Sequence, residues 1–203
     1  MSEKVIAFTG AGISKPSGIP TFKEQDGIRD YLRRKYFNNK PKRFYEKTLE
    51  MKEVINKAEP NDAHKALAKY NVPVITMNID NLHREAGTED LLEIHGNMNQ
   101  VYCNYCGNYY EFEKVKETIN CPDCDELLHH GIVLYGDMIP SLFKAEQMVR
   151  DEELDRLIIV GTSFYTSTAN HIKDIAKANK KKVTIINEKA EEKLPKLLEE
   201  IFN

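Results

Sequence analysis

The feature of this sequence that most constrains its fold is a series of short apolar runs, each of which ends at glycine or at a polar residue. Helix-like segments, such as residues 61–70 and 169–180, separate several of these runs. Fully apolar strands that alternate with helices are typical of a parallel sheet covered on both faces, so we predict an α/β fold. The predicted strands comprise residues 5–9, 72–76, 132–136, 157–161 and 183–187.

Glycine or polar residues follow four of the predicted strands. In a parallel sheet, ligands bind at the carboxyl ends of the strands, so we expect one binding site at this rim. The segments are Gly10-Ala11-Gly12, Asn78-Ile79-Asp80, Gly161-Thr162-Ser163 and Asn187-Glu188.

The glycine turn after the first strand indicates a nucleotide phosphate, although weakly. Gly10 and Gly12 match the first two positions of the dinucleotide fingerprint, but Ser14 and Lys15 stand where the third glycine is required. The turn is therefore either a tight strand-to-helix connection without a ligand or a cradle of backbone amides around a pyrophosphate. Glu188 is the acidic residue that could meet a ribose hydroxyl.

Composition limits the classes of protein to consider. The chain has 203 residues, of which 41% are apolar and 30% charged, and its net charge is −3. These values are typical of one globular domain and give no reason to expect an anionic membrane or nucleic acid as a partner. The longest apolar runs are too short to span a bilayer, and no signal peptide is expected, so we predict a cytoplasmic protein.

The four cysteines occur as two C-x-x-C pairs separated by 14 residues. Two such loops can close a tetrahedral zinc site with no open position for catalysis. A redox pair is the alternative, but two pairs with no cysteine left over favour structural zinc. We expect a short strand at residues 108–112 between the pairs. The predicted ligands are Cys103, Cys106, Cys121 and Cys124.

His95, followed by Gly96, is the candidate general base. Imidazole has the unperturbed pKa nearest neutrality, and this histidine lies between the polar Asn78–Asp80 segment and the first cysteine pair. We interpret His64, His83 and His171 as packing or surface residues. The basic, aromatic stretch 29–47 could contact nucleic acid, but an amphipathic helical lobe is the preferred interpretation.

Eight ordered motifs resemble those of the sirtuins, the NAD-dependent protein lysine deacylases, and specifically a compact bacterial-type member. The resemblance extends from about residue 5 to about residue 200. It is carried by the glycine motif that continues to Phe22, the segments 60–67 and 76–83, His95-Gly96, the cysteine pairs, Gly136-Asp137, Gly161-Thr162-Ser163 and residues 194–198.

The resemblance implies a single catalytic domain over residues 1–203. A Rossmann-like core would comprise about residues 1–25, 60–98 and 130–203. A helical lobe would span about 26–59, and a zinc-ribbon subdomain about 99–129.

The resemblance also implies a reaction and the residues that perform it. The acyl group of a protein lysine would move to the ADP-ribose part of NAD, and nicotinamide would be released. His95 would take a proton from a ribose hydroxyl, and Asn78 would order water and ribose. The remaining NAD contacts would be Gly10, Ala11, Gly12, Ile13, Thr21, Phe22, Lys23, Met77, Ile79, Asp80, Gly161, Thr162, Ser163, Asn187 and Glu188. Substrate contacts would be Tyr45 and the segment Ile132, Val133, Leu134 and Tyr135, which would pair with the peptide backbone.

Some positions depart from the family pattern. Met77 replaces a glutamine, Lys23 replaces an arginine, and Thr48 stands where an arginine would accept acidic acyl groups. The segment between Glu188 and the last helix is shortened, which would open the adenine side of the pocket. An NAD glycohydrolase or ADP-ribosyltransferase on the same scaffold is the alternative function. A non-enzymatic module that binds NAD or nucleic acid is a second one.

Overall fold

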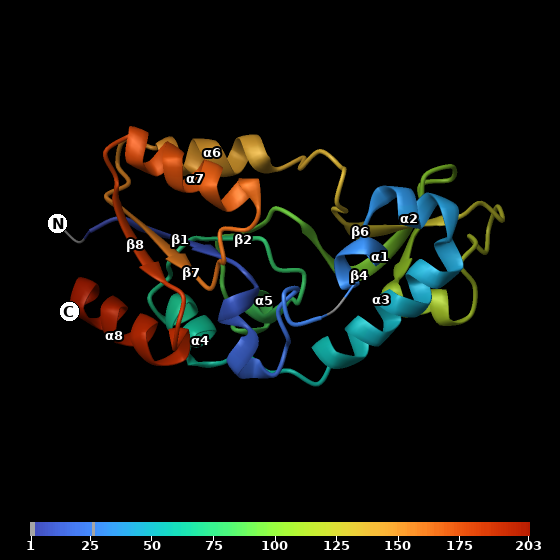
Figure 1. Cartoon of the computed structure of the whole chain (residues 1–203), viewed down its shortest axis with the longest axis horizontal. Coiled ribbons are helices and arrows are strands. Elements are labelled where there is room, and N and C mark those ends of the chain that lie inside the picture. The colour runs from blue at the N-terminus through green and yellow to red at the C-terminus, as the bar shows by residue number, and fades with distance from the viewer. Residues whose placement is uncertain (1–2, 26) are drawn as a thin grey trace.

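A computed structural model describes residues 3–25 and 27–203. Five strands form a wholly parallel sheet in the order β3-β2-β1-β7-β8. Helices α4 and α8 cover one face, and α6 and α7 cover the other (Figure 1). The predicted α/β class with both faces covered is confirmed. The strands are β1 (Val5–Thr9), β2 (Val74–Thr76), β3 (Leu91–Glu93), β7 (Arg156–Val160) and β8 (Lys182–Ile186), and the helices are α4 (Asp62–Lys69), α6 (Leu142–Arg150), α7 (Ser167–Ala178) and α8 (Ala190–Phe202).

The central strands are apolar throughout because each of their faces packs against helices. In β1, Val5 and Ala7 join the core beneath α4 and α8, whereas Ile6 and Phe8 join the core beneath α6 and α7. Alternate side chains of a strand point to opposite faces, so a strand buried on both faces needs apolar residues at every position. This is why the apolar runs predicted the sheet.

The predicted strand at 132–136 is wrong. Residues 128–132 form β6 (Leu128–Ile132), which pairs antiparallel with β4 (Gly96–Cys103) in a separate three-stranded sheet completed by β5 (Tyr109–Glu111). The run is apolar because Ile132 and Leu134 are buried in the core of a second lobe, which the small sheet forms with the helices of residues 28–55. The short edge strand β3 was not predicted, since its three residues are only half-buried.

The three-stranded sheet packs against the helices α1 (Ile28–Tyr31), α2 (Arg34–Asn39) and α3 (Pro41–Ile55) at the opposite end of an elongated molecule (Figure 1). The expected start of the helical lobe at Asp26 lies outside the described residues. The connection from β2 to β3 carries α5 (Leu82–Glu85), which lies near the middle of the molecule (Figure 1). Short 3₁₀ turns complete the elements at Ala11–Ile13, Lys15–Ser17 and Phe112–Lys116.

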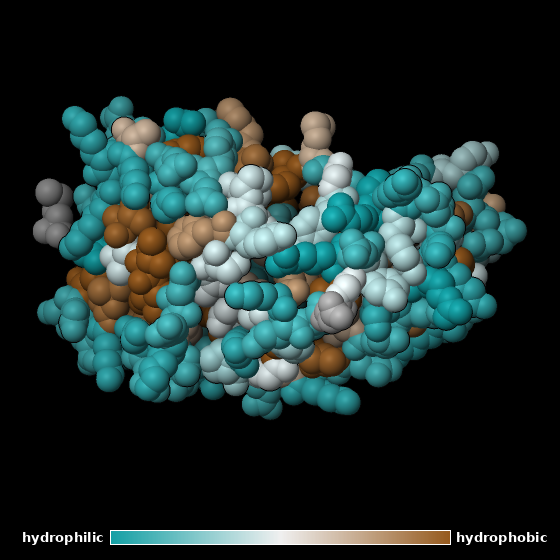
Figure 2. Space-filling view, in the orientation of Figure 1, coloured by the Kyte–Doolittle hydropathy of each residue, from teal (hydrophilic) through white to brown (hydrophobic). Residues whose placement is uncertain are grey.

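Strand β8 is an edge of the parallel sheet, and Ile185 in its middle is 48% exposed. Figure 2 shows apolar atoms gathered at the end of the molecule where Figure 1 places β8. Across residues 3–25 and 27–203, the structure contains no helix of the length and apolarity that a bilayer crossing requires.

Candidate functional site

The glycine turn after β1 lies directly against the end of β7. The amide of Gly10 donates to the carbonyl of Val160 at 3.0 Å, and the amide of Gly12 donates to the carbonyl of Gly161 at 2.8 Å. A Cβ atom at Gly12 would lie 2.7 Å from the Cα of Gly161. Only glycine permits this approach of two backbones, so the turn forms a tight cradle at the carboxyl rim of the sheet.

A polar cluster surrounds the hydroxyl of Ser14, just beyond this cradle. Ser14 Oγ donates to Asp80 Oδ2 at 2.6 Å and accepts from Asn78 Nδ2 at 3.1 Å. All three residues are buried. The hydroxyl therefore joins the β1 turn to the segment that follows β2, and Asn78 and Asp80 are fixed relative to each other.

The carboxylate of Asp80 is buried and accepts hydrogen bonds from the hydroxyl of Ser14 and the amide of Leu82. Burial raises its pKa above the usual range, while hydrogen bonds from Ser14 and from the amide of Leu82 oppose the rise. A buried carboxylate held by two donors suits a neutral hydrogen-bonding ligand such as a carboxamide. The assignment of Asp80 as an NAD contact stays a prediction.

His95 immediately precedes β4, and its ring lies beside the backbone carbonyl of Met77. Its Nδ1 is 3.0 Å from the carbonyl oxygen of Met77, which can only accept, so Nδ1 carries the proton and Nε2 has the free lone pair. Burial lowers the pKa of His95, and the bond to Met77 partly offsets that effect. A neutral imidazole with a free Nε2 is the form that a general base requires.

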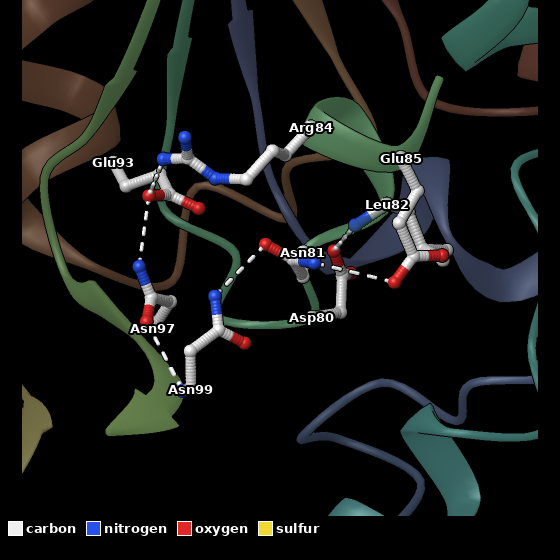
Figure 3. A network of polar contacts seen from close by, with 8 residues as sticks. All are labelled: Asp80, Asn81, Leu82, Arg84, Glu85, Glu93, Asn97 and Asn99. Carbon is white, nitrogen blue, oxygen red and sulfur yellow. Dashed lines mark hydrogen bonds and ion pairs between the residues drawn. The ribbon is translucent and has the colours of Figure 1, made fainter. Parts of the chain in front are cut away.

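A network of amide side chains holds the segment after β2 against the start of β4 (Figure 3). Asn99 Nδ2 donates to Asn81 Oδ1 at 3.1 Å, and Asn97 Nδ2 donates to Glu93 at 3.0 Å. Arg84 also donates to Glu93, at 2.7 Å. Asparagines near a turn form no distinctive pattern, so these residues could not be recognised from the sequence. They link the neighbourhoods of Asp80 and His95.

The other residues predicted at the carboxyl rim of the sheet differ in how firmly they are held near Asn78 and Asp80. The amide of Thr162 donates to Asn187 Oδ1 at 3.0 Å, which brings the ends of β7 and β8 together. Met77 contacts Thr166 through its sulfur at 3.7 Å and lies beside Gly10. Glu188 and Lys23 are exposed, and among the described residues neither makes a side-chain hydrogen bond or ion pair that would fix it near Asn78.

An NAD molecule fits the residues present. The glycine cradle would lose its space if either Gly10 or Gly12 carried a side chain, since added Cβ atoms there meet neighbours at 3.1 and 2.7 Å. In addition, Thr162 Oγ1 is buried and has no partner among the described residues. Narrow glycine turns and an unpaired buried hydroxyl at one rim are what a phosphate-bearing ligand would complete.

Tyr45 and the segment 132–135 are not available for substrate contact in the way that the sequence predicted. Tyr45 is 1% exposed, and its hydroxyl donates to the carbonyl of Leu128 at 2.6 Å, so it belongs to the core between α3 and the small sheet. The amides of Val133, Leu134 and Tyr135 donate to His95, Asp137 and Leu32. The predicted pairing of this segment with a peptide therefore has no free amide donor in these residues.

The four cysteines form a closed cluster at the tip of the small sheet. Their sulfur atoms all lie within 4.8 Å of one another, with Cys103–Cys124 at 3.4 Å and Cys106–Cys121 at 3.6 Å. Sulfur ligands about 2.3 Å from a tetrahedral zinc ion lie roughly 3.8 Å apart. The cluster therefore fits zinc, and four sulfur ligands would leave the ion no open position for catalysis.

Thr9, His64 and His83 are buried polar residues beside the site, although the sequence indicated only a strand position for Thr9 and packing or surface positions for the two histidines. Thr9 Oγ1 donates to Thr76 Oγ1 at 2.8 Å, and His83 Nε2 is 2.9 Å from Thr9 Oγ1. His64 is completely buried and lies 3.4 Å from Ser14 Oγ. A histidine in a helix gives no sequence signal that distinguishes simple packing from a bond to a site residue.

Fold and site define a class of protein: an α/β protein with a tight glycine cradle at the carboxyl rim of its sheet, a buried neutral histidine beside that rim and a four-cysteine cluster that fits zinc. A family model described as the Sir2 family matches residues 10–168. The chain belongs to the Sir2 family, the sirtuins.

Similar proteins support this assignment. An NAD-dependent protein deacylase of Thermococcus kodakarensis is 38% identical over 202 residues, which cover 90% of this chain and 79% of that protein. One of Pyrococcus furiosus is 36% identical and covers 98% and 94%. A solved Sir2 homologue in complex with NAD has a TM-score of 0.87 and 29% identity, with 98% and 90% covered. Sir2Tm bound to a propionylated peptide has the same TM-score and 30% identity.

Proposed function

We propose that this chain is an NAD-dependent protein lysine deacylase that uses His95 as its general base. The single observation that carries the proposal is the orientation of His95, whose Nδ1 is bonded to Met77 so that Nε2 is free on the rim that holds Asn78 and Asp80. When bound, NAD would supply the ribose that accepts the acyl group and the nicotinamide that leaves.

The chain's own residues would bind and orient NAD and would exclude water from it. The glycine cradle and Thr162 would hold the phosphates, and Asp80 would hold a carboxamide. Asn78 would order the ribose, while Phe22 would exclude water. His95 Nε2 would take a proton from a ribose hydroxyl, which makes that oxygen nucleophilic toward the bound acyl group.

The substrates would be acyl-lysine proteins whose acyl group is neutral. The hydroxyl of Thr48 is buried and donates to the carbonyl of Phe44 at 3.0 Å, so it offers nothing to a carboxylate. The hydroxyl of the neighbouring Tyr45 is also engaged within the core. We therefore expect acetyl- and propionyl-lysine peptides to react and a succinyl-lysine peptide to react poorly.

The test is mass spectrometry of NAD incubated with and without acetyl-, propionyl- and succinyl-lysine peptides. The proposal predicts nicotinamide and acyl-ADP-ribose only when a neutral acyl peptide is present. Free ADP-ribose formed equally fast without peptide would instead identify an NAD glycohydrolase, and transfer of ADP-ribose to protein would identify a transferase.

The role of His95 is tested by His95→Ala, with His171→Ala as the matched control. His171 is exposed in α7 and bonds only to Glu146, so its loss should leave turnover unchanged. Removal of a general base should lower kcat by roughly 100-fold or more. Turnover by His95→Ala within a few-fold of the parent chain would remove His95 from the mechanism.

A further inference from the structure

His83 is a buried histidine with one defined partner, and its position differs from that of a simple packing residue. It is 2% exposed, and its Nε2 lies 2.9 Å from Thr9 Oγ1. Its other ring nitrogen, Nδ1, is buried and has no partner among the described residues. Its ring packs against that of His64, with centroids 4.8 Å apart. The contact with Thr9 is therefore the polar interaction that orients this ring.

That contact begins a chain of hydrogen bonds that ends at Asn78. Thr9 Oγ1 donates to Thr76 Oγ1 at 2.8 Å, and Thr76 Oγ1 accepts from the backbone amide of Asn78 at 3.0 Å. Because Thr9 gives its single hydroxyl proton to Thr76, His83 Nε2 must donate to Thr9. All four hydrogen-bonded residues in this series are buried, so water cannot replace a missing hydrogen bond.

We propose that His83 is a positioning residue for Asn78, acting through Thr9 and Thr76. The inference rests on the proposed function, because it assigns Asn78 to the ribose pocket. The side chain of Asn78 is held by Ser14 from one side, at 3.1 Å. The hydrogen bonds from His83 end at the backbone amide of the same residue, so the two contacts together restrain the direction of the carboxamide.

This role requires a neutral His83 imidazole that carries its proton on Nε2. Burial lowers the pKa of His83 well below its ordinary value, and the nearby His64 lowers it further. The ring therefore stays neutral across the neutral pH range, with its proton on Nε2. Loss of this donor should let Asn78 move and admit water beside the ribose.

The experiment compares His83→Leu with His83→Gln in the full-length chain, with NAD and an acetyl-lysine peptide. Leucine fills the space without a donor, whereas the glutamine amide can still donate to Thr9. His83→Leu should raise the KM for NAD by about 3- to 10-fold, the range expected for one lost buried hydrogen bond. It should also raise the ratio of free ADP-ribose to acyl-ADP-ribose, and His83→Gln should largely restore both values.

Thr76→Val alone keeps the inference falsifiable if His83→Leu folds poorly, and the double variant tests whether the two residues act together. Thr76→Val removes the last hydroxyl of the chain and leaves His83 in place. If His83 acts through this chain, His83→Leu combined with Thr76→Val should give the product ratio of Thr76→Val alone. Additive changes, or an unchanged product ratio and KM in both single variants, would overturn the inference.

The product ratio distinguishes positioning from packing, because it does not depend on the fraction of folded enzyme. The outcome is also separate from that of the proposed function. If the parent chain makes no acyl-ADP-ribose, the proposed function fails. If the parent chain is active and the variants are additive, only the role of His83 fails.

Discussion

At the scale of single residues, the backbone at Gly96 explains why His95 is followed by glycine. Its φ is +69°, and a Cβ atom there would lie 2.0 Å from the carbonyl oxygen of Gly131. The backbone crosses β6 at this point, and the carbonyl of His95 accepts from Val133 nearby. The position of His95 therefore depends on a backbone approach that no other residue permits.

Gly96→Ala should destabilise the chain by about 1–3 kcal/mol or more, because the backbone of β6 must shift. Gly87→Ala is the matched control. Gly87 also has a positive φ, of +88°, but nothing lies within 4 Å of its added Cβ. It should cost only about 1 kcal/mol of conformational strain. Urea denaturation measures both, and equal losses would show that the contact with Gly131 is not critical.

At the scale of elements, the zinc cluster supports more than its own loops. Cys103 and Cys121 belong to the same core as Phe37 and Phe44 from α2 and α3. Four converging thiolates repel one another unless a cation holds them. The metal should therefore stabilise the helices that pack on the small sheet.

Metal analysis should find about one zinc ion per chain. Removal of zinc by a chelator should increase hydrogen exchange in α3, while α4 and α8 on the parallel sheet stay protected. Cys121→Ser should reproduce the effect, and Tyr105→Ser, a change at an exposed position between two of the cysteines, should not. Unchanged exchange in α3 after complete loss of zinc would contradict this coupling.

The connection after β6 is held to α2 by a partly buried ion pair. Arg34 donates to both carboxylate oxygens of Asp137, at 2.8 and 2.7 Å. The guanidinium chiefly holds the pKa of Asp137 below its usual range. Asp137 also accepts from the amide of Leu134, so the same carboxylate orders the segment that was assigned to the peptide.

Arg34→Gln should therefore increase hydrogen exchange at the amide of Leu134, because the carboxylate that accepts from this amide loses its charge-assisted partner. Arg33→Gln is the control, since among the described residues the Arg33 side chain pairs with the exposed Asp30 alone. Hydrogen exchange measured in both variants would compare the two changes. Equal exchange at Leu134 in the two variants would show that the Arg34–Asp137 pair does not order this segment.

At the scale of the whole molecule, buried histidines should limit stability in acid. Burial lowers the pKa values of His64 and His130 to about 4, below the ordinary value of 6.5. The unfolded chain therefore binds protons between about pH 6.5 and 4 that the folded chain does not. Stability is complete above pH 6.5 and falls as the pH approaches 4.

Each of these two histidines should contribute up to about 3 kcal/mol to this loss. Free energies of unfolding from urea titrations at pH 7, 5.5 and 4.5 would measure the slope. His130→Phe should flatten it, because His130 packs between aromatic rings of α2 and α3 and both its ring nitrogens lack partners among the described residues. A slope unchanged by His130→Phe would show that this residue does not titrate on unfolding.

Much of the fold and part of the site could be predicted from local pattern. The runs that became β1, β7 and β8 are apolar because the strands are buried, and the cysteine spacing specifies a metal cluster whatever the rest of the chain does. The segment 132–136 has the same apolar character as a sheet strand. The apolar pattern alone could not show that its first residue ends β6 and that Leu134 packs in the core of the second lobe. Burial in that core requires the same residue types as burial in the parallel sheet.

The sequence by itself determined the α/β class, the zinc ligands and the rim residues, because each depends on residue type at short spacing. Only the tertiary structure decided which polar groups meet. Ser14 bonds to Asp80 across 66 residues, and His83 reaches Thr9 across 74. It also placed Tyr45 in the core and left Nε2 of His95 free. These outcomes depend on how distant segments pack, and hydrogen bonds form only where packing brings donor and acceptor within about 3 Å.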